Sequence, residues 1–220
     1  MKFLPLITAA CVTSLLASPA TAQLPRKLPV AVLDIRGFYP KLGQDPTTAQ
    51  DLGLESADLP SRALGGVAGL HVYPLRFEKM ALGIGAEGIL ARGHHEVGGG
   101  DDDALDPGDS LLTQPVDQRL RGLAGVISLN FGHREGWSYL TAGLGPMTFI
   151  TYPGGARPAE APPVSNTLTF GGGARWFMKP HLAFTFDLRF YQTRPELQTA
   201  SYPRRQRNKL LIMSAGVSIK

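Results

Sequence analysis

Apolar and polar residues alternate with a period of two over most of the chain after Pro29. The clearest run is residues 182–191, LAFTFDLRFY, in which every second residue is leucine or phenylalanine. Such alternation is typical of strands with one apolar face. The pattern predicts eight strands, with these boundaries: 29–39, 63–73, 80–93, 118–131, 137–152, 166–177, 182–193 and 208–219.

The connections between these strands alternate between long and short. With the predicted boundaries they contain 23, 6, 24, 5, 13, 4 and 14 residues. The long ones are rich in Gly, Pro, Asp and Ser, whereas the short ones resemble turns. Outer-membrane barrels have short periplasmic turns and long outer loops, and a soluble barrel has no reason to gather its long loops at one end. The sequence therefore predicts an all-β, eight-stranded, antiparallel up-and-down transmembrane β-barrel.

The polar face of the predicted strands carries few charges. Lysines fall at strand ends, in turns or near loops, and most polar positions within strands hold Gly, Ser or Thr. The exceptions are three acids and three arginines: Asp34, Arg36, Glu87, Arg175, Asp187 and Arg189. Because an unpaired buried charge costs several kcal/mol, we expect these six to pair inside a lumen that side chains fill.

Aromatic residues near the predicted strand ends suggest a girdle at the two membrane interfaces. The predicted girdle consists of Tyr39, Tyr73, Trp137, Tyr152, Trp176 and Tyr191.

The first 22 residues have the features of a signal peptide. Lys2 precedes a short apolar stretch, and Ala20-Thr21-Ala22 gives a small-x-small cleavage pattern. We therefore predict a signal peptide over 1–22 and a mature barrel domain over 23–220. Cys11 is the only cysteine, so the mature chain would contain no disulfide. The formal net charge of +4 is too weak and too dispersed to indicate nucleic-acid binding.

Two neighbouring strands carry a recognisable motif. The stretch 171–177, GGGARWF, is followed by a tight turn and by 181–191, HLAFTFDLRFY. This motif resembles the small bacterial outer-membrane β-barrel proteins of the porin-like OmpA/OmpX class, in which a G-G-G-x-R-aromatic strand precedes a strand ending D-x-R-x-aromatic. The resemblance implies a barrel inserted by the outer-membrane assembly machinery. The last strand of that class usually ends on an aromatic residue, whereas this chain ends on Lys220.

Candidate chemistry is sparse. His94-His95-Glu96 and the acids of 101–109 offer carboxylate and imidazole groups, but their spacing fits no defined metal loop. We expect a solvated outer loop there, with no metal and no cofactor. The outer-end serines and histidines, Ser61, Ser110, His94 and His95, show no spacing of a nucleophile and its base, so we expect no enzyme.

A basic cluster lies in the last long connection. Arg204, Arg205 and Arg207 are predicted to contact lipopolysaccharide phosphates, because guanidinium groups bind phosphate bidentately. The alternative is a generic solubilising loop.

These expectations combine into a non-enzymatic protein of the cell outer membrane that supports envelope integrity or presents loops for surface interaction. Its expected partners are outer-membrane lipids and lipopolysaccharide, and we expect a monomer that binds no nucleic acid. Three alternatives remain: a secreted soluble barrel that binds a small apolar ligand, a narrow channel, and a lipid A-modifying enzyme.

Overall fold

The computed structural model describes residues 29–97, 115–133, 135–154 and 157–220. The predicted signal peptide and the acidic stretch 101–109 lie outside the described residues. The elements are β1 (Ala31–Phe38), α1 (Pro46–Asp51), η2 (Ser56–Asp58), β2 (Leu64–Arg76), β3 (Met80–Glu96), β4 (Pro115–His133), β5 (Gly136–Pro153), β6 (Ser165–Lys179), β7 (Leu182–Gln192) and β8 (Lys209–Ile219).

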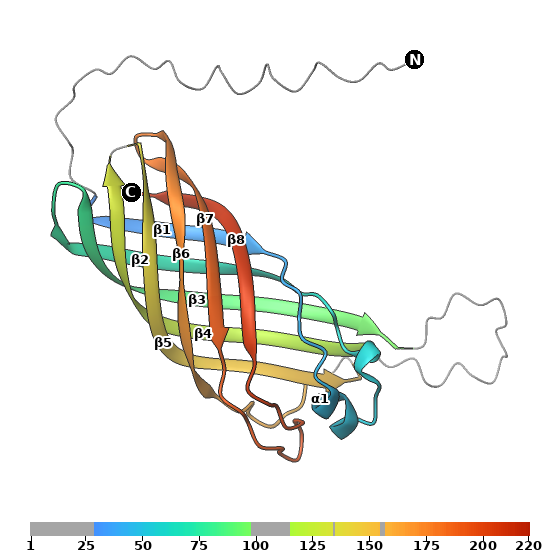
Figure 1. Ribbon diagram of the computed structural model, residues 1–220. Coiled ribbons are helices and arrows are strands. Elements are labelled where there is room, and N and C mark those ends of the chain that lie inside the picture. The colour runs from blue at the N-terminus through green and yellow to red at the C-terminus, as the bar shows by residue number, and fades with distance from the viewer. Residues whose placement is uncertain (1–28, 98–114, 134, 155–156) are drawn as a thin grey trace, which may run out of the picture.

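The eight strands form one closed antiparallel barrel in which each strand pairs with its neighbours in the chain. The barrel closes between the first and last strands, from Leu33 opposite Ile219 to Phe38 opposite Ser214 (Figure 1). This confirms the predicted eight-stranded up-and-down barrel. Each strand boundary lies within three residues of the prediction, because the period-two pattern extends over most of each strand.

Short turns lie at one end of the barrel, and α1 and the described long connections lie at the other (Figure 1). At the loop end, β3, β4 and β5 contain 17, 19 and 18 residues and are longer than predicted. A tilted strand needs only about 9–11 residues to cross a bilayer. These three strands therefore extend beyond the length that a membrane requires.

The first long connection contains two short helices that the sequence pattern did not predict. Asp45 caps α1 by accepting a hydrogen bond from the Thr47 backbone N–H at 3.1 Å, and Pro46 occupies the first turn. Ala49 and Leu59 are buried against Val116 of β4, so this connection packs on the loop end of the barrel. Within the described part of the chain, no helix has the length and apolar character needed to cross a membrane.

The barrel interior has an apolar layer towards each end. The cluster at the loop end comprises Phe38, Leu42, Ala63, Val67, Ile89, Leu120, Met147, Phe149, Tyr191, Leu210 and Ile212. The cluster at the turn end comprises Val32, Tyr73, Ala81, Trp137 and Tyr139, with Phe177 packed against it. The charged residues of the lumen lie between these two layers.

The predicted aromatic girdle is wrong for most of its members. Tyr39 and Trp176 are exposed on the outside. The other four, Tyr73, Trp137, Tyr152 and Tyr191, are each at most 4 % exposed. Three of them belong to the interior clusters, and Tyr152 packs with Ile150 beneath Tyr202 of the last long connection. For Tyr73, Trp137 and Tyr191, the phase relative to the apolar row decides which face the residue occupies. Tyr152 is in phase with the outward row of β5 but is covered by Tyr202.

Candidate functional site

Four charged side chains form a closed ring of alternating sign across the barrel interior. Arg36 of β1 lies 2.8 Å from Glu87 Oε1 on β3 and 2.7 Å from Asp187 Oδ2 on β7. Arg189, also on β7, contacts Glu87 and lies 2.9 Å from Asp187 Oδ2. Each arginine thus bridges both carboxylates. The ring joins strands that are far apart in the sequence, and its net charge is zero.

The other two charged residues form a second pair beside this ring. Arg175 of β6 binds Asp34 of β1 through two nitrogens, with Nε–Oδ1 at 3.1 Å and Nη2–Oδ2 at 2.5 Å. His71 connects the pair to the ring, because its Nε2 lies 3.3 Å from Asp34 Oδ2 and 3.2 Å from Glu87 Oε1. The structure therefore brings all six predicted lumen residues together, and it adds His71, which the sequence analysis did not select.

Gly173 of the GGGARWF motif leaves space for an aromatic residue in this charged layer. A Cβ atom added at Gly173 would lie 2.6 Å from the Tyr139 hydroxyl and 2.3 Å from the Phe186 carbonyl oxygen. That hydroxyl donates to Asp187 Oδ2 at 2.8 Å, and the Arg175 guanidinium lies 4.2 Å from the Tyr139 ring centroid. The motif thus combines an arginine with the space that the arginine's aromatic neighbour requires.

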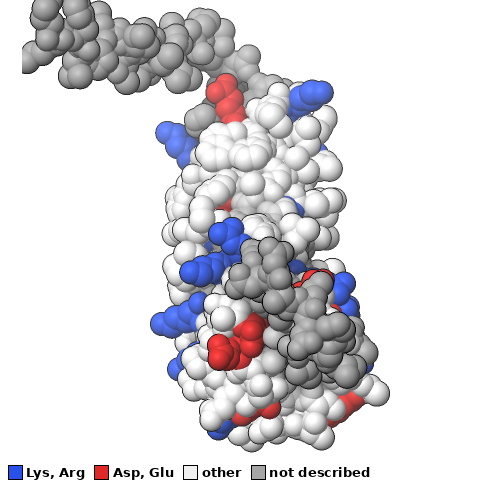
Figure 2. Space-filling model, turned by 90° about the vertical axis from the view of Figure 1, so that its right-hand side faces the viewer, with Lys and Arg blue, Asp and Glu red and all other residues white. Residues whose placement is uncertain are grey.

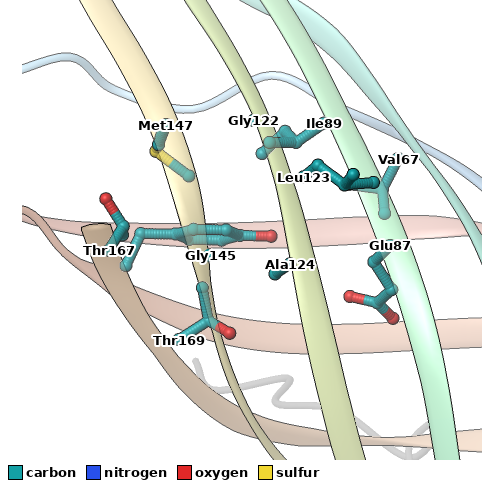
Figure 3. A pocket seen from close by; sticks show the side chains of 11 residues that line it. Val67, Glu87, Ile89, Gly122, Leu123, Ala124, Gly145, Met147, Thr167 and Thr169 are labelled. Atoms are coloured by element: carbon teal, nitrogen blue, oxygen red, sulfur yellow. The ribbon is translucent and has the colours of Figure 1, made fainter. Parts of the chain in front are cut away.

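Little free space remains in the lumen beside the ionic layer. The cavity between Glu87 and the loop-end layer is lined by Met147, Thr167 and Thr169, among others, and has a volume of about 10 Å³. Figure 3 shows Met147, Thr167 and Glu87 projecting into it from different strands. A volume of that size holds about one water molecule. At this level the lumen is therefore filled by side chains.

The outside of the barrel is apolar around its whole circumference. Each strand exposes at least one large apolar residue, between 41 and 60 % exposed. Examples of these residues, one from each strand in chain order, are Ile35, Leu70, Ile84, Ile127, Leu140, Phe170, Phe184 and Met213. We call the outward surface at this level the apolar belt. On β4 the outward row of the belt runs from Leu123 to Phe131. Charged residues of the strands face outward only above or below the belt.

Aromatic side chains also pair across strands on this outer surface. Phe170 and Phe190 stack with their centroids 5.3 Å apart, and Trp176 and Phe184 stack at 6.0 Å. Figure 2 shows a charge-poor band on one side of the barrel, with basic side chains gathered along the edge of the molecule below it. A water-exposed surface rarely keeps so continuous an apolar area.

The extended β3–β4 hairpin contains a small polar cluster above the belt. Arg92 donates to Asp117 from Nε at 3.1 Å and from Nη2 at 3.0 Å, and His94 Nδ1 lies 3.1 Å from the same carboxylate. Burial raises the pKa of Asp117, but the hydrogen bonds from His94 and Arg92 outweigh it, so the pKa lies below its usual range. No group of three metal-ligating side chains occurs among the described residues.

The structure separates the three arginines predicted to contact lipopolysaccharide. Arg205 is only 8 % exposed, lies 2.8 Å from Glu196 Oε1 and donates to the Phe149 carbonyl, so it does not belong to an exposed basic surface. Burial raises the pKa of Glu196 although Arg205 acts in the opposite direction. Arg204 is exposed and lies 3.1 Å from Asp51 near the end of α1, and Arg207 is exposed.

The fold and the interior together define a closed eight-stranded antiparallel barrel with an apolar exterior and a neutralised ionic layer inside. No family model and no curated protein matches this chain. Two solved structures similar to it are both of Ail, the attachment invasion locus protein of Yersinia pestis. One of them, in complex with the heparin analogue sucrose octasulfate, is 11 % identical with a TM-score of 0.42, covering 86 % of this chain and 99 % of Ail.

The second Ail structure is 10 % identical with a TM-score of 0.39 and covers 86 % of this chain and 96 % of the other. Similarity at this level says nothing about what the present chain binds.

The substitution Asp34→Asn tests the buried ion pair. We expect it to destabilise the barrel by about 3–5 kcal/mol, because Arg175 then keeps a buried charge without its carboxylate. Adding Arg175→Met to Asp34→Asn should restore much of the loss. Urea unfolding in detergent micelles, followed by the heat-modifiable gel band, measures both effects. The control Arg204→Gln breaks a half-exposed pair and should cost no more than about 1 kcal/mol. Equal losses for Asp34→Asn and Arg204→Gln would contradict the importance of the buried pair.

The substitution Gly173→Ala tests the packing of Tyr139. We expect a loss of about 1–3 kcal/mol in the free energy of unfolding, because the added methyl meets the Phe186 carbonyl oxygen and displaces the Tyr139 hydroxyl from Asp187. Gly125→Ala is the matched control, since a Cβ there meets only the Leu144 carbonyl oxygen, at 4.0 Å. The same unfolding assay compares the two variants. Indistinguishable stabilities would show that the glycine does not serve Tyr139.

Acid should loosen the β3–β4 extension. The depressed pKa of Asp117 means that its contribution to stability is present above the unfolded value of about 3.9 and is lost as pH falls through the folded pKa. We therefore expect amide hydrogen exchange near His94 and Asp117 to increase, after correction for intrinsic rates, as pH falls below about 4. In Asp117→Asn this acid dependence should disappear. An unchanged acid response in that variant would assign the effect to another group.

Proposed function

We propose that this chain is an integral outer-membrane β-barrel protein with a side-chain-filled lumen. The observation that carries the proposal is the apolar belt, which surrounds the whole barrel while the charged residues at the same level face inward. An aqueous solvent would favour the opposite arrangement. The gathering of the long connections at one end agrees with periplasmic turns and outer loops.

The role that fits this arrangement is support of the envelope or presentation of the outer loops at the surface, without catalysis. A soluble barrel that binds an apolar ligand would need an apolar interior cavity, whereas this lumen holds six charged residues and little space. A narrow channel would need a path past both apolar layers. Export through the predicted signal peptide, insertion by the outer-membrane assembly machinery and a monomeric state are parts of this proposal.

Contact with lipopolysaccharide also belongs to the proposal. For Arg204 and Arg207 this contact stays a prediction. Arg205 is left out of it, because its guanidinium is engaged by Glu196 inside the loop end of the barrel.

A charged residue in the belt tests the proposal directly. Ile127 lies at the middle of the outward row of β4 and is 60 % exposed. If lipid surrounds it, Ile127→Arg should destabilise the barrel in lipid vesicles by about 2–4 kcal/mol. If water surrounds it, the change should stay within about 0.5 kcal/mol. Leu197→Arg is the control, since Leu197 is 88 % exposed in the last long connection.

Cell fractionation provides the second readout. The wild-type chain should be found in the detergent-insoluble outer-membrane fraction and should migrate differently in boiled and unboiled gels. A chain recovered in the periplasmic fraction, together with a neutral Ile127→Arg, would overturn the proposal.

A further inference from the structure

Basic residues lie on the outward face of the barrel immediately above the apolar belt. On β4 the outward positions that precede Leu123 are Arg121 and Arg119. Arg92 of β3 pairs directly opposite Arg119, and Arg121 pairs opposite Leu90. Consecutive outward residues of a strand are separated by about 7 Å, so these guanidinium groups occupy the first two rows above the belt.

Among the described residues, little negative charge accompanies these arginines. Asp117 is the described carboxylate within reach, and its oxygens are taken by Arg92 and His94. Among the described residues, Arg119 and Arg121 have no carboxylate within ion-pair distance. Arg119 makes one cation–π contact, 5.7 Å from the Tyr152 ring centroid. Counted over the described residues, the site therefore keeps an excess of positive charge.

The same surface is hollowed and partly apolar. One shallow groove between β2, β3 and β4 is lined by Leu64, Leu90, Arg92, Arg119 and Arg121, together with Gly65 and Gly66. A second groove continues across β5, where Arg157 and Val164 join Arg121. Leu64, Leu90 and Val164 are 62–71 % exposed. Guanidinium groups thus lie directly beside exposed aliphatic side chains.

We propose that Arg119 and Arg121, with Arg92 and Arg157 beside them, bind the phosphate groups of a lipid A-type glycolipid, whose acyl chains then lie along the belt. The inference rests on the proposed function, which places this end of the barrel in the outer leaflet. A guanidinium at this level meets phosphates without leaving the interface, and its planar fork matches phosphate oxygens bidentately. The exposed leucines and Val164 provide the adjacent surface for acyl chains, which a free phosphate ion would not use.

The row position also explains why these arginines are tolerated. On β4 the uncharged outward row spans nine residues from Leu123 to Phe131, which is the length of a tilted strand crossing a bilayer. A charge within that row would be costly, whereas the next row lies at the headgroups. The site is distinct from Arg204 and Arg207, which lie on the last long connection.

The test compares two double variants of the refolded full chain in detergent micelles. Arg119→Gln/Arg121→Gln removes two charges at the proposed site. Lys79→Gln/Lys179→Gln removes two exposed charges at the turn end of the barrel and is the matched control. Three probes are used: bisphosphorylated lipid A, the same lipid A after removal of its phosphates, and inorganic phosphate. Native mass spectrometry measures binding, and the heat-modifiable gel band reports folding.

We expect the wild type and the lysine control to bind bisphosphorylated lipid A equally well, and the arginine variant to bind it at least tenfold more weakly. Dephosphorylated lipid A should bind the wild type no better than it binds the arginine variant. Three outcomes would each overturn the site. The first is an equal loss of binding in the two double variants, and the second is equal affinity for both forms of lipid A. The third is competition by millimolar phosphate without a preference for lipid A.

Two further measurements keep the outcomes separate. If the double variant does not fold, Arg121→Gln alone is compared with Lys179→Gln in the same assay. Insertion of the wild type into lipid vesicles is measured independently. A barrel that inserts but shows no phosphate-dependent binding contradicts the lipid A site alone, whereas a barrel that does not insert overturns the proposed function together with the site.

Discussion

Charge neutralisation inside the barrel is the interaction on which the rest of the structure depends. Arg36, Glu87, Asp187 and Arg189 come from three strands, and only a closed barrel brings β1 within reach of β7. Removing one member leaves a buried charge without a partner, at a cost of several kcal/mol. A shift of any of these strands by one residue would turn its charge to the outer surface. The ring therefore fixes strand register as well as closure.

The two apolar layers strengthen this interaction. They lie on both sides of the charged residues and leave about 10 Å³ of space beside Glu87, so few water molecules screen the ion pairs. The interior charges in turn require the large apolar residues of the same strands to face outward. The neutral interior and the apolar exterior thus both follow from the alternation of polar and apolar residues along each strand.

The sequence predicted the fold well because period two is a local signal. It selected Asp34 and Arg175 for the lumen by their phase, but it did not indicate which charges would meet, since pairing depends on strand order and tilt around the closed barrel. His71 and Tyr139 were missed because glycines and a proline blur the apolar pattern on β2 and β5. The inward orientation of Tyr191 could have been predicted from the sequence, because Tyr191 is out of phase with the apolar row of residues 182–190.

Loop structure was less accessible to the sequence. Residues 46–51 form a helix too short to show a helical period, and its capping by Asp45 is a local detail. The sequence does not distinguish Arg205 from Arg204 and Arg207, since all three lie in the same basic stretch. Arg205 is nevertheless buried, because its neighbours in space are Glu196 and Phe149. Periodicity says nothing about such contacts between a loop and the barrel mouth.

A filled lumen also limits where the protein can interact with other molecules. No described cavity passes through the ionic layer, so recognition by the described barrel depends on its outer surface and its loop end. On that surface the outward row of β4 changes abruptly from leucine and isoleucine to arginine at Arg121. Ile127, Arg121 and Arg119 all lie on the outward face of β4. In the proposed membrane Ile127 lies against acyl chains, and Arg121 and Arg119 lie at the level of the phosphates. One strand would thus determine both the depth of the barrel in the bilayer and the charge that it presents to the outer leaflet.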